Sequence, residues 1–226
     1  MLVDGSSTEA WDGLSPPWKR AFELAWASFG EGNFGIGAVL TDPRDSTEPI
    51  VAEGRNAVLA GPADQPIVGN YMAHAEMNAF ATMSSFSARG PHLYTTLEPC
   101  LMCGATAIFL NLAEVRYAAR DEYYEPFERE LWPHHPYTAT RQPTMSQPIS
   151  GRLSAFARLL PLSHTIETNA KSAPAEHART HRPQLSALAG SSAMNDLRQL
   201  ARSGSSVSEG LNAVWSDLPI DEFVGI

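Results

Sequence analysis

Apolar residues recur at two different spacings along the first half of the chain. Between residues 18 and 29 they recur every three or four positions, which is the spacing of one face of a helix. Ser15 is a suitable N-cap for this helix, and Gly30 is a suitable end. Two short apolar runs bounded by turn residues follow at 35–41 and 49–59, and they predict a hairpin of two strands.

The next four segments continue the alternation between helix and strand. Residues 73–83 are rich in helix-forming residues, and 92–97 have the composition of a strand. Residues 101–111 predict a second, buried helix, and 113–119 predict another strand. The resulting order, helix–strand–strand–helix–strand–helix–strand, is typical of an open α/β sheet with helices on both faces.

The second half of the chain has a different character. Residues 121–150 are acidic and aromatic at first, with one short helix expected before Pro133, and then predict a proline-containing loop. Residues 152–168 fit either a helix or a late strand, 168–192 predict a linker, and 193–215 show helical spacing. We therefore divide the chain into a loose lead-in at 1–14, a main domain at 15–165 and a C-terminal extension at 166–226, partly linker and partly helical.

Composition places the chain among globular proteins. Its 226 residues suffice for one substantial domain, and 43% hydrophobic residues with 18% charged residues support a packed core. No apolar run approaches the roughly 20 residues of a membrane-spanning helix. The first residues lack the basic region and apolar run of a secretory signal. We expect a cytoplasmic protein that does not bind membranes.

Net charge argues against a nucleic-acid partner. The formal charge is −9, from 25 acidic and 16 basic residues, and only Lys19 and Lys171 are lysines. Contacts with phosphates supply most of the affinity of nucleic-acid-binding proteins, so an acidic surface disfavours that class. The average charge is still compatible with a local basic patch.

Two cysteines, Cys100 and Cys103, are the first candidates for chemistry. Their number does not make a disulfide framework, and their spacing suits either a redox pair or half of a metal site. At the start of a helix, this spacing puts both sulfurs on one face and favours thiolates. Three protein ligands with an open fourth position are the pattern of catalytic zinc. His74 is the best third ligand because it opens a helix after two strands.

Glu76 follows His74 by two positions. In a regular helix such residues point roughly opposite ways, so both face one cavity only in the first turn. There Glu76 would lie beside an activated water and carry protons, without binding the metal. The alternative is an ordinary exposed helix residue.

These residues form a motif. The segments H-A-E at 74–76 and P-C-L-M-C at 99–103 match the H-x-E…P-C-x-x-C signature, and the chain here resembles the zinc-dependent cytidine deaminase-like superfamily. The wider strings AHAEMNA and TLEPCLMCGATAI are similar to bacterial tRNA adenosine deaminases and to guanine deaminases. The resemblance covers roughly residues 16–121. It implies a three-layer α/β/α sandwich with a five-stranded mixed sheet, one Zn²⁺ per chain held by His74, Cys100 and Cys103, and hydrolytic deamination with Glu76 carrying protons.

The resemblance also implies residues that contact the substrate. Asn56 matches a strand-two asparagine that contacts the base or ribose, and the backbone N–H of Ala75 matches another contact. Phe34 lies where an aromatic ring could stack on a base, and Asp121 or Glu122 could bind an exocyclic amine. The alternatives are a turn residue at Asn56, a core residue at Phe34 and a solvated acidic helix face after residue 120.

Five histidines raise the question of a second metal site. They occur in segments rich in proline or lacking clear periodicity, which favours solvated loops over a metal site. They are His134, His135, His164, His177 and His181.

The leading functional hypothesis is a zinc-dependent hydrolytic deaminase of a free base or nucleoside, with a purine favoured. A tRNA adenosine-to-inosine deaminase is the first alternative: the motif strings favour it, while the charge and the missing Lys/Arg cluster oppose it. A pyrimidine or specialised-metabolite deaminase is another. A non-catalytic zinc-binding partner subunit is the last, and Glu76 argues against it. The resemblance further implies a homodimer.

Overall fold

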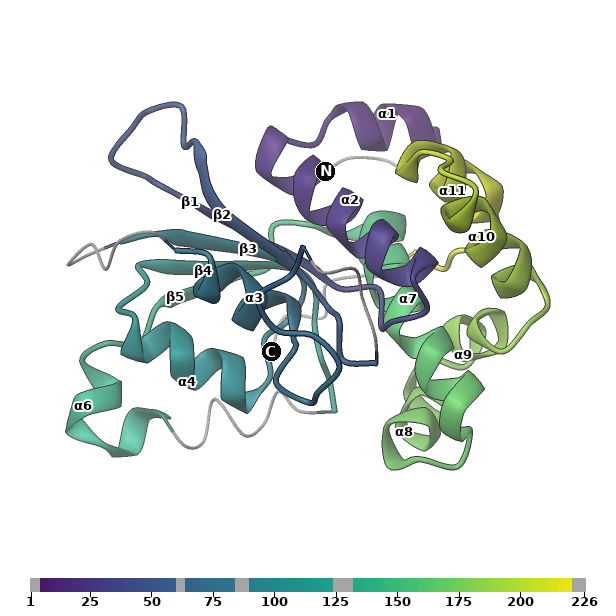
Figure 1. Ribbon diagram of the computed structural model, residues 1–226. Helices are drawn as coiled ribbons and strands as arrows, with labels where there is room; N and C mark the ends of the chain where they lie inside the picture. Colours follow the sequence, from purple (N-terminus) through teal and green to yellow (C-terminus); the bar gives the residue numbers. More distant parts are fainter. Residues whose placement is uncertain (1–4, 60–63, 84–89, 124–131, 221–226) are drawn as a thin grey trace.

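A five-stranded mixed sheet lies at the centre of the structure (Figure 1). The computed structural model describes residues 5–59, 64–83, 90–123 and 132–220. The strand order is β2-β1-β3-β4-β5, with β1 antiparallel to both of its neighbours and β4 parallel to both of its own. The strands are β1 (Gly37–Thr41), β2 (Ile50–Arg55), β3 (His92–Leu97), β4 (Glu114–Ala119) and β5 (Thr144–Ser146). The five-stranded mixed sheet implied by the resemblance is confirmed.

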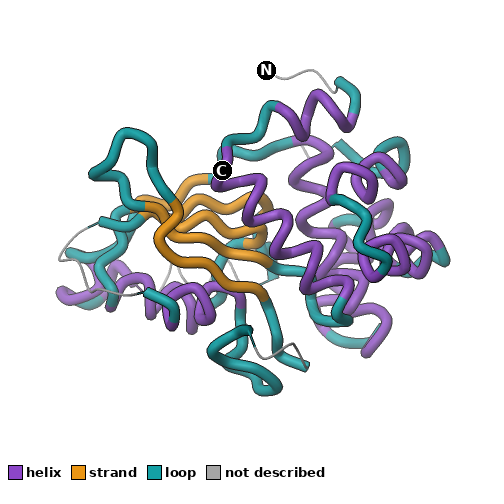
Figure 2. Tube along the Cα trace, turned by 45° about the horizontal axis from the view of Figure 1, so that its top comes forward, coloured by secondary structure: helices purple, strands orange, loops and turns teal. Residues whose placement is uncertain are grey.

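Helices cover both faces of this sheet, so that the strands form the middle layer in Figure 2. Helices α2 and α7 pack on one face, and α3 and α4 pack on the other. The helices before β5 are α1 (Ser7–Asp12), α2 (Pro16–Gly30), α3 (Ala75–Ala81), α4 (Leu101–Phe109), the 3₁₀ turn η1 (Trp132–His134) and α6 (Pro136–Ala139). Those after β5 are α7 (Gly151–Asn169), α8 (Ala173–His181), α9 (Pro183–Ala189), α10 (Ala193–Arg202) and α11 (Val207–Val214).

The two faces carry separate hydrophobic cores. Successive residues of a strand point to opposite faces, so Val39 of β1 joins the core under α2 while Leu40 joins the core under α3. On the α2 side, the ring of Phe22 stacks on Phe156 of α7 at 6.4 Å. Burial on both faces explains why β1 is a continuous apolar run in the sequence.

The C-terminal extension contains more helix than the sequence suggested. The linker prediction for 168–192 is wrong, because α8 and α9 occupy most of it. Pro174 and Pro183 lie in the first turns of these helices, where proline is favoured and does not break a helix. The segment that fitted either helix or strand is α7, and the boundary expected at residue 165 falls inside it.

From residue 5 onward the lead-in is ordered, in contrast to the prediction of a loose segment. Ser6 and Glu9 form a capping box that starts α1. The hydroxyl of Ser7 donates to Asn212 Oδ1 at 2.9 Å, so α1 is attached to α11. The short helix expected before Pro133 falls mainly on residues 124–131, outside the described part of the chain. Within the described residues, no helix combines the length and apolarity needed to cross a bilayer.

Helices α10 and α11 pack back onto α2. The indole of Trp26 donates from Nε1 to the carbonyl of Ser205 at 2.7 Å. Gly210 of α11 lies directly under the same indole, where an added Cβ would come within 2.3 Å of the ring. The C-terminal extension is therefore attached to the first helix of the main domain.

Gly54 of β2 allows α3 to lie directly on the sheet. A Cβ at this position would come within 2.3 Å of the Ala79 nitrogen and 2.5 Å of the Ala75 oxygen. We expect Gly54→Ala to lower the free energy of unfolding by about 1–3 kcal/mol, because backbone must move to admit it. Urea unfolding would measure the change against Gly190→Ala, whose Cβ would meet its neighbours at 3.6 Å or more. Equal stability of the two variants would contradict this packing.

Candidate functional site

The N-termini of α3 and α4 converge at one point on the carboxyl side of β3. His74 and Cys100 are the N-cap residues of these helices, both with extended backbone. Cys103 lies in the first turn of α4, and Glu76 lies in the first turn of α3. Helix N-termini carry partial positive charge, which favours thiolates at this position.

Asn78 fixes the loop that leads to His74. Its Nδ2 donates to the carbonyls of Arg55 at 3.0 Å and Ile67 at 3.1 Å, and its Oδ1 accepts from the Ile67 amide at 2.8 Å. This fully buried amide ties the end of β2 to the loop before α3. Asn78 was not among the predicted site residues, although it lies four residues after His74.

The three candidate ligands are spaced as zinc ligands. Cys100 Sγ and Cys103 Sγ are 3.7 Å apart, and His74 Nδ1 lies 3.5 Å and 3.6 Å from them. Tetrahedral zinc, with bonds of about 2.3 Å to sulfur and about 2.0–2.1 Å to nitrogen, requires edges of about 3.8 Å and about 3.6 Å. Over the described residues, these three form the group of His, Cys, Asp or Glu side chains close enough to hold one ion. The donor set therefore fits Zn²⁺.

The two thiols differ in acidity. The hydrogen bond between the two sulfurs lowers the pKa of Cys100 to about 4, against the effect of burial, and His74 adds to this. The same hydrogen bond and burial raise the pKa of Cys103. Without a cation the pair shares one negative charge, and binding a divalent cation displaces the remaining proton.

Glu76 stands beside this group without belonging to it. Its Oε1 accepts a hydrogen bond from the Thr95 hydroxyl at 2.8 Å, and its Oε2 lies 3.5 Å from Cys103 Sγ. The side chain is 4% exposed, and burial raises the pKa of its carboxyl group, an effect that His74 partly opposes. Glu76 is thus a buried carboxyl group that can hold a proton beside the metal ligands.

A cavity of about 700 Å³ opens at these residues. His74, Glu76 and Cys100 line it from the main domain. Another part of its wall, the C-terminal wall, comes from α7, α8 and the residue that follows α8. The side chains of this wall include Arg158, Leu162, His164, Thr165, Asn169, His177 and Arg182.

Comparison with known families agrees with this site. Residues 17–119 match the family model of the cytidine and deoxycytidylate deaminase zinc-binding region. This segment contains all three candidate ligands and Glu76. Residues 17–119 are therefore similar to the zinc-binding region of this family. The matched segment contains strands β1 to β4 and helices α2, α3 and α4.

Individual relatives of the deaminase region differ in what they act on. A probable deoxycytidylate deaminase of Drosophila melanogaster is 40% identical over 53 residues, which are 24% of this chain and 26% of that protein. The solved guanine deaminase of Nitrosomonas europaea is 23% identical, with a TM-score of 0.48 over 73% of this chain and 96% of its own. A solved tRNA:A34 deaminase is 24% identical, with a TM-score of 0.44 over 56% of this chain and 92% of its own.

Three of the four predicted substrate residues line the larger cavity, and the fourth, Ala75, lies next to it. Asn56, Phe34 and Asp121 line it. Asn56 is buried, and its Oδ1 accepts from the Val58 amide at 3.2 Å. Ala75 is the first residue of α3, buried between the two residues that do line the cavity.

Glu122, for which an amine contact is a prediction, lines the cavity and also forms ion pairs. Its carboxylate lies between Arg158 of α7 and Arg182, which follows α8. Arg158 Nη1 is 3.1 Å from Glu122 Oε1, and Arg182 donates from Nε at 3.2 Å as well as from Nη2. This cluster joins the loop after β4 to the C-terminal wall.

The histidine prediction is wrong for three of the five residues. His164 lies buried in α7 and not in a solvated loop. His177 and His181 lie one turn apart on α8, with ring centroids separated by 4.2 Å.

The C-terminal wall was missed because its residues come from helices that the sequence suggested only in part.

The Glu122 cluster makes stability dependent on pH. Burial raises the pKa of Glu122, but Arg182 and Arg158 outweigh it and lower the pKa to about 2. A lowered carboxyl pKa contributes stability above the unfolded value and loses it as the pH falls toward 2. Between pH 5 and 2 the wild-type protein should lose roughly 3 kcal/mol more than Glu122→Gln. Thermal unfolding across this range measures the difference, and parallel curves would contradict the assignment.

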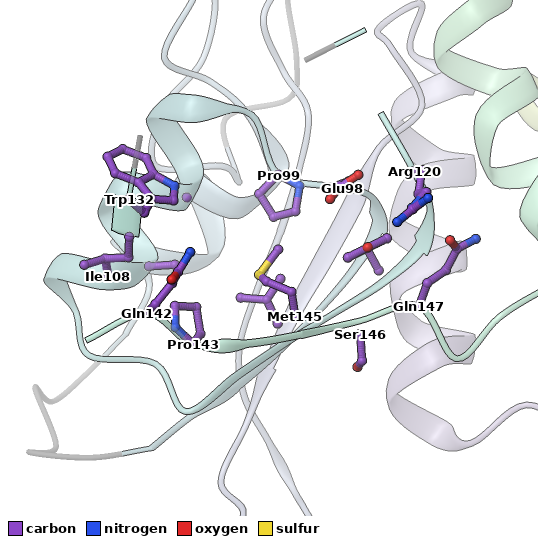
Figure 3. Close-up of a pocket in the computed structure, with 14 residues that line it drawn as sticks. Glu98, Pro99, Ile108, Arg120, Trp132, Gln142, Pro143, Met145, Ser146 and Gln147 are labelled. Carbon is purple, nitrogen blue, oxygen red and sulfur yellow. The ribbon is translucent and has the colours of Figure 1, made fainter. Parts of the chain in front are cut away.

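A second, smaller cavity lies behind Glu98 and Pro99, between α4 and β5 (Figure 3). Its volume is about 390 Å³, and Glu98 and Arg120 line both this cavity and the larger one. Met145 and Pro99 face its interior. None of the three candidate ligands lines this cavity, whereas His74 and Cys100 line the larger one, so we assign the chemistry to the larger cavity.

Proposed function

We propose that this protein is a zinc-dependent hydrolytic deaminase, which converts an amino-substituted base or nucleoside to the oxo product and releases ammonia. A purine is the favoured substrate. The observation that carries this proposal is the position of Glu76, whose Oε2 lies 3.5 Å from Cys103 Sγ and which lines one cavity together with the candidate ligands His74 and Cys100. A proton carrier beside a three-ligand zinc site is the arrangement that hydrolytic deamination requires.

Each residue of the site has a step to perform. His74, Cys100 and Cys103 would hold Zn²⁺, which when bound supplies a Lewis acid that makes water more acidic. Glu76 Oε2 takes a proton from the attacking water and delivers it to the ring nitrogen beside the reacting carbon. The oxygen of the water remains on that carbon as a hydroxyl group. Glu76 then carries the proton of this hydroxyl to the amino group, the C–N bond breaks, ammonia leaves and the oxo group remains. Thr95 holds the other oxygen of Glu76 in place.

The cavity favours a small substrate over RNA. Helices α7 and α8 close one side of it, and the chain as a whole carries a formal charge of −9. An RNA hairpin would have to approach past these helices against the average charge of the protein.

Ammonia release by the zinc-loaded protein tests the proposal. The panel contains guanine, adenine, cytosine, their nucleosides and a tRNA anticodon stem-loop, with chelator-treated protein as the control. Ammonia from a purine base or nucleoside supports the proposal. Ammonia from the stem-loop alone would make the protein an RNA-editing enzyme, and ammonia from no compound in the panel would favour the non-catalytic partner subunit.

We also propose that the protein forms a cytoplasmic homodimer. Exposed apolar side chains on α4 support this, since Leu101 is 41% exposed and Phe109 is 72% exposed. Light scattering would show twice the mass of one chain, and a single-chain mass at all concentrations would contradict the dimer.

A further inference from the structure

Helix α7 presents one of its faces to the active-site cavity over most of its length. Arg158, Leu162, Thr165 and Asn169 line the cavity at spacings of three and four residues, which is one side of a helix. This stripe extends over about 16 Å. The stripe lies outside residues 17–119, so the chain adds this wall to the deaminase region.

His164 is the one histidine of this wall that is almost completely buried. It is 4% exposed, and its ring centroid lies 4.4 Å from that of Phe34, with the planes at 58°. Both side chains line the cavity that contains Glu76. The pair therefore joins α7 to the loop before β1 at the wall of the site.

The buried Nδ1 atom of His164 makes no hydrogen bond to the described residues. This atom is also closed off from solvent. A buried polar atom without a partner is unfavourable, and an apolar ring of similar size would pack in its place without that penalty. The polarity of this ring therefore has to be explained by something other than packing.

The charge and the tautomer of the ring follow from its surroundings. Burial lowers the pKa of His164, and Arg198 lowers it further against the effect of Glu167, so the ring is neutral at pH 7. A proton on Nδ1 would be a buried donor with no acceptor, whereas a proton on Nε2 avoids this. Since Nδ1 is closed off, a hydrogen bond from the ring to a molecule in the cavity comes from Nε2.

We propose that His164 is a specificity-determining residue, whose Nε2–H donates a hydrogen bond to a ring-nitrogen acceptor on the substrate base. The acceptor lies on the edge of the base remote from the amino group that is removed, because Glu76 and the candidate ligands belong to the starts of α3 and α4, which pack on the opposite face of the sheet from α7. A purine has such a nitrogen in its second ring or across its first, while its deaza analogue has a C–H there. This inference rests on the proposed function and names the feature of the substrate that α7 recognises.

The test compares purines with their deaza analogues in three proteins. The substrates are guanine with 7-deazaguanine and adenine with 3-deazaadenine. The proteins are the wild type, His164→Phe, which keeps a ring against Phe34, and His164→Gln, which keeps an N–H near the position of Nε2. The measured quantities are kcat/KM, bound zinc and the melting temperature. Ser163→Ala is the matched control, since Ser163 is the buried neighbour on α7 that bonds to its own helix at 2.8 Å.

The expected pattern separates recognition from structure. The wild-type protein should prefer its purine over the deaza analogue by roughly 10- to 100-fold. His164→Phe should lose that preference and act on the purine roughly 10- to 100-fold more slowly, with unchanged zinc and an equal or higher melting temperature. His164→Gln should regain part of the preference, and Ser163→Ala should keep all of it.

Two results would overturn the inference, and they have different meanings. A wild-type protein that treats purine and deaza analogue alike, or a His164→Phe variant that still discriminates between them, would remove the role of His164 and leave the proposed function intact. A wild-type protein that deaminates no purine would overturn the favoured substrate class, and this inference with it.

Discussion

Glu76→Gln is expected to lower the rate of deamination by about 10²- to 10⁴-fold while zinc stays bound. The amide of glutamine can still accept the hydrogen bond from Thr95, now 2.8 Å from the carboxylate, but it cannot carry a proton. No metal ligand is lost, because His74, Cys100 and Cys103 form the triad without it. The neutral side chain also removes a buried acidic group beside two thiolates, so stability should be equal or greater.

The measurement combines ammonia release, bound zinc and thermal unfolding on the same preparation. Glu176→Gln is the matched control, since Glu176 is an exposed carboxylate on α8 that does not line the cavity. The control should keep full activity. Loss of zinc from Glu76→Gln would show that Glu76 is a ligand, and unchanged activity would show that it carries no proton.

The chemistry of the site could be predicted from few residues because the metal imposes its own geometry. Two cysteines three apart at a helix start, with one histidine at another helix start, leave few ways to complete a zinc site. The structure brings these atoms within 3.5–3.7 Å of each other. The role of Glu76 depended on its lying in the first turn of α3, and the helix begins at Ala75.

Some helices and one strand were not predicted, in part because their residues usually indicate loops. Pro174 and Pro183 suggested a linker, yet both occupy first turns, where the missing N–H of proline has no partner to lose. Strand β5 was missed because three residues are too few to show alternation, and its pairing with β4 comes from residues 30 positions earlier. Ser6 and Glu9 did carry a readable signal, the capping box, which was overlooked in a polar segment.

The C-terminal wall could not be predicted for a different reason. Helix α7 is buried on nearly every side, so its apolar residues do not form a stripe that would distinguish a cavity face from a core face. Glu122 pairs with Arg158 and Arg182, which lie 36 and 60 positions later in the sequence. Pairings over such separations are set by the packing of α7 on the sheet and of α8 on α7, and no local sequence pattern predicts them.

Cys103→Ser is expected to remove zinc from the protein and with it all zinc-dependent activity. A serine hydroxyl does not ionise near neutral pH and is a poor ligand for zinc, which prefers thiolate sulfur and imidazole nitrogen. The site would keep only His74 and Cys100. Loss of residues that merely orient ligands weakens metal binding by about 10- to 100-fold, so loss of a ligand should exceed this.

Zinc content after dialysis against a buffered chelator gives the direct measurement, and thermal unfolding gives a second one that needs no activity. Ligands that bind only the folded state stabilise it, so added zinc should raise the melting temperature of the wild-type protein and of Met102→Leu. Met102 lies between the two cysteines and is not part of the triad. Zinc should have little effect on Cys103→Ser. A serine variant with full zinc would exclude Cys103 as a ligand, and set beside Glu76→Gln the two variants separate the binding of the metal from the movement of protons.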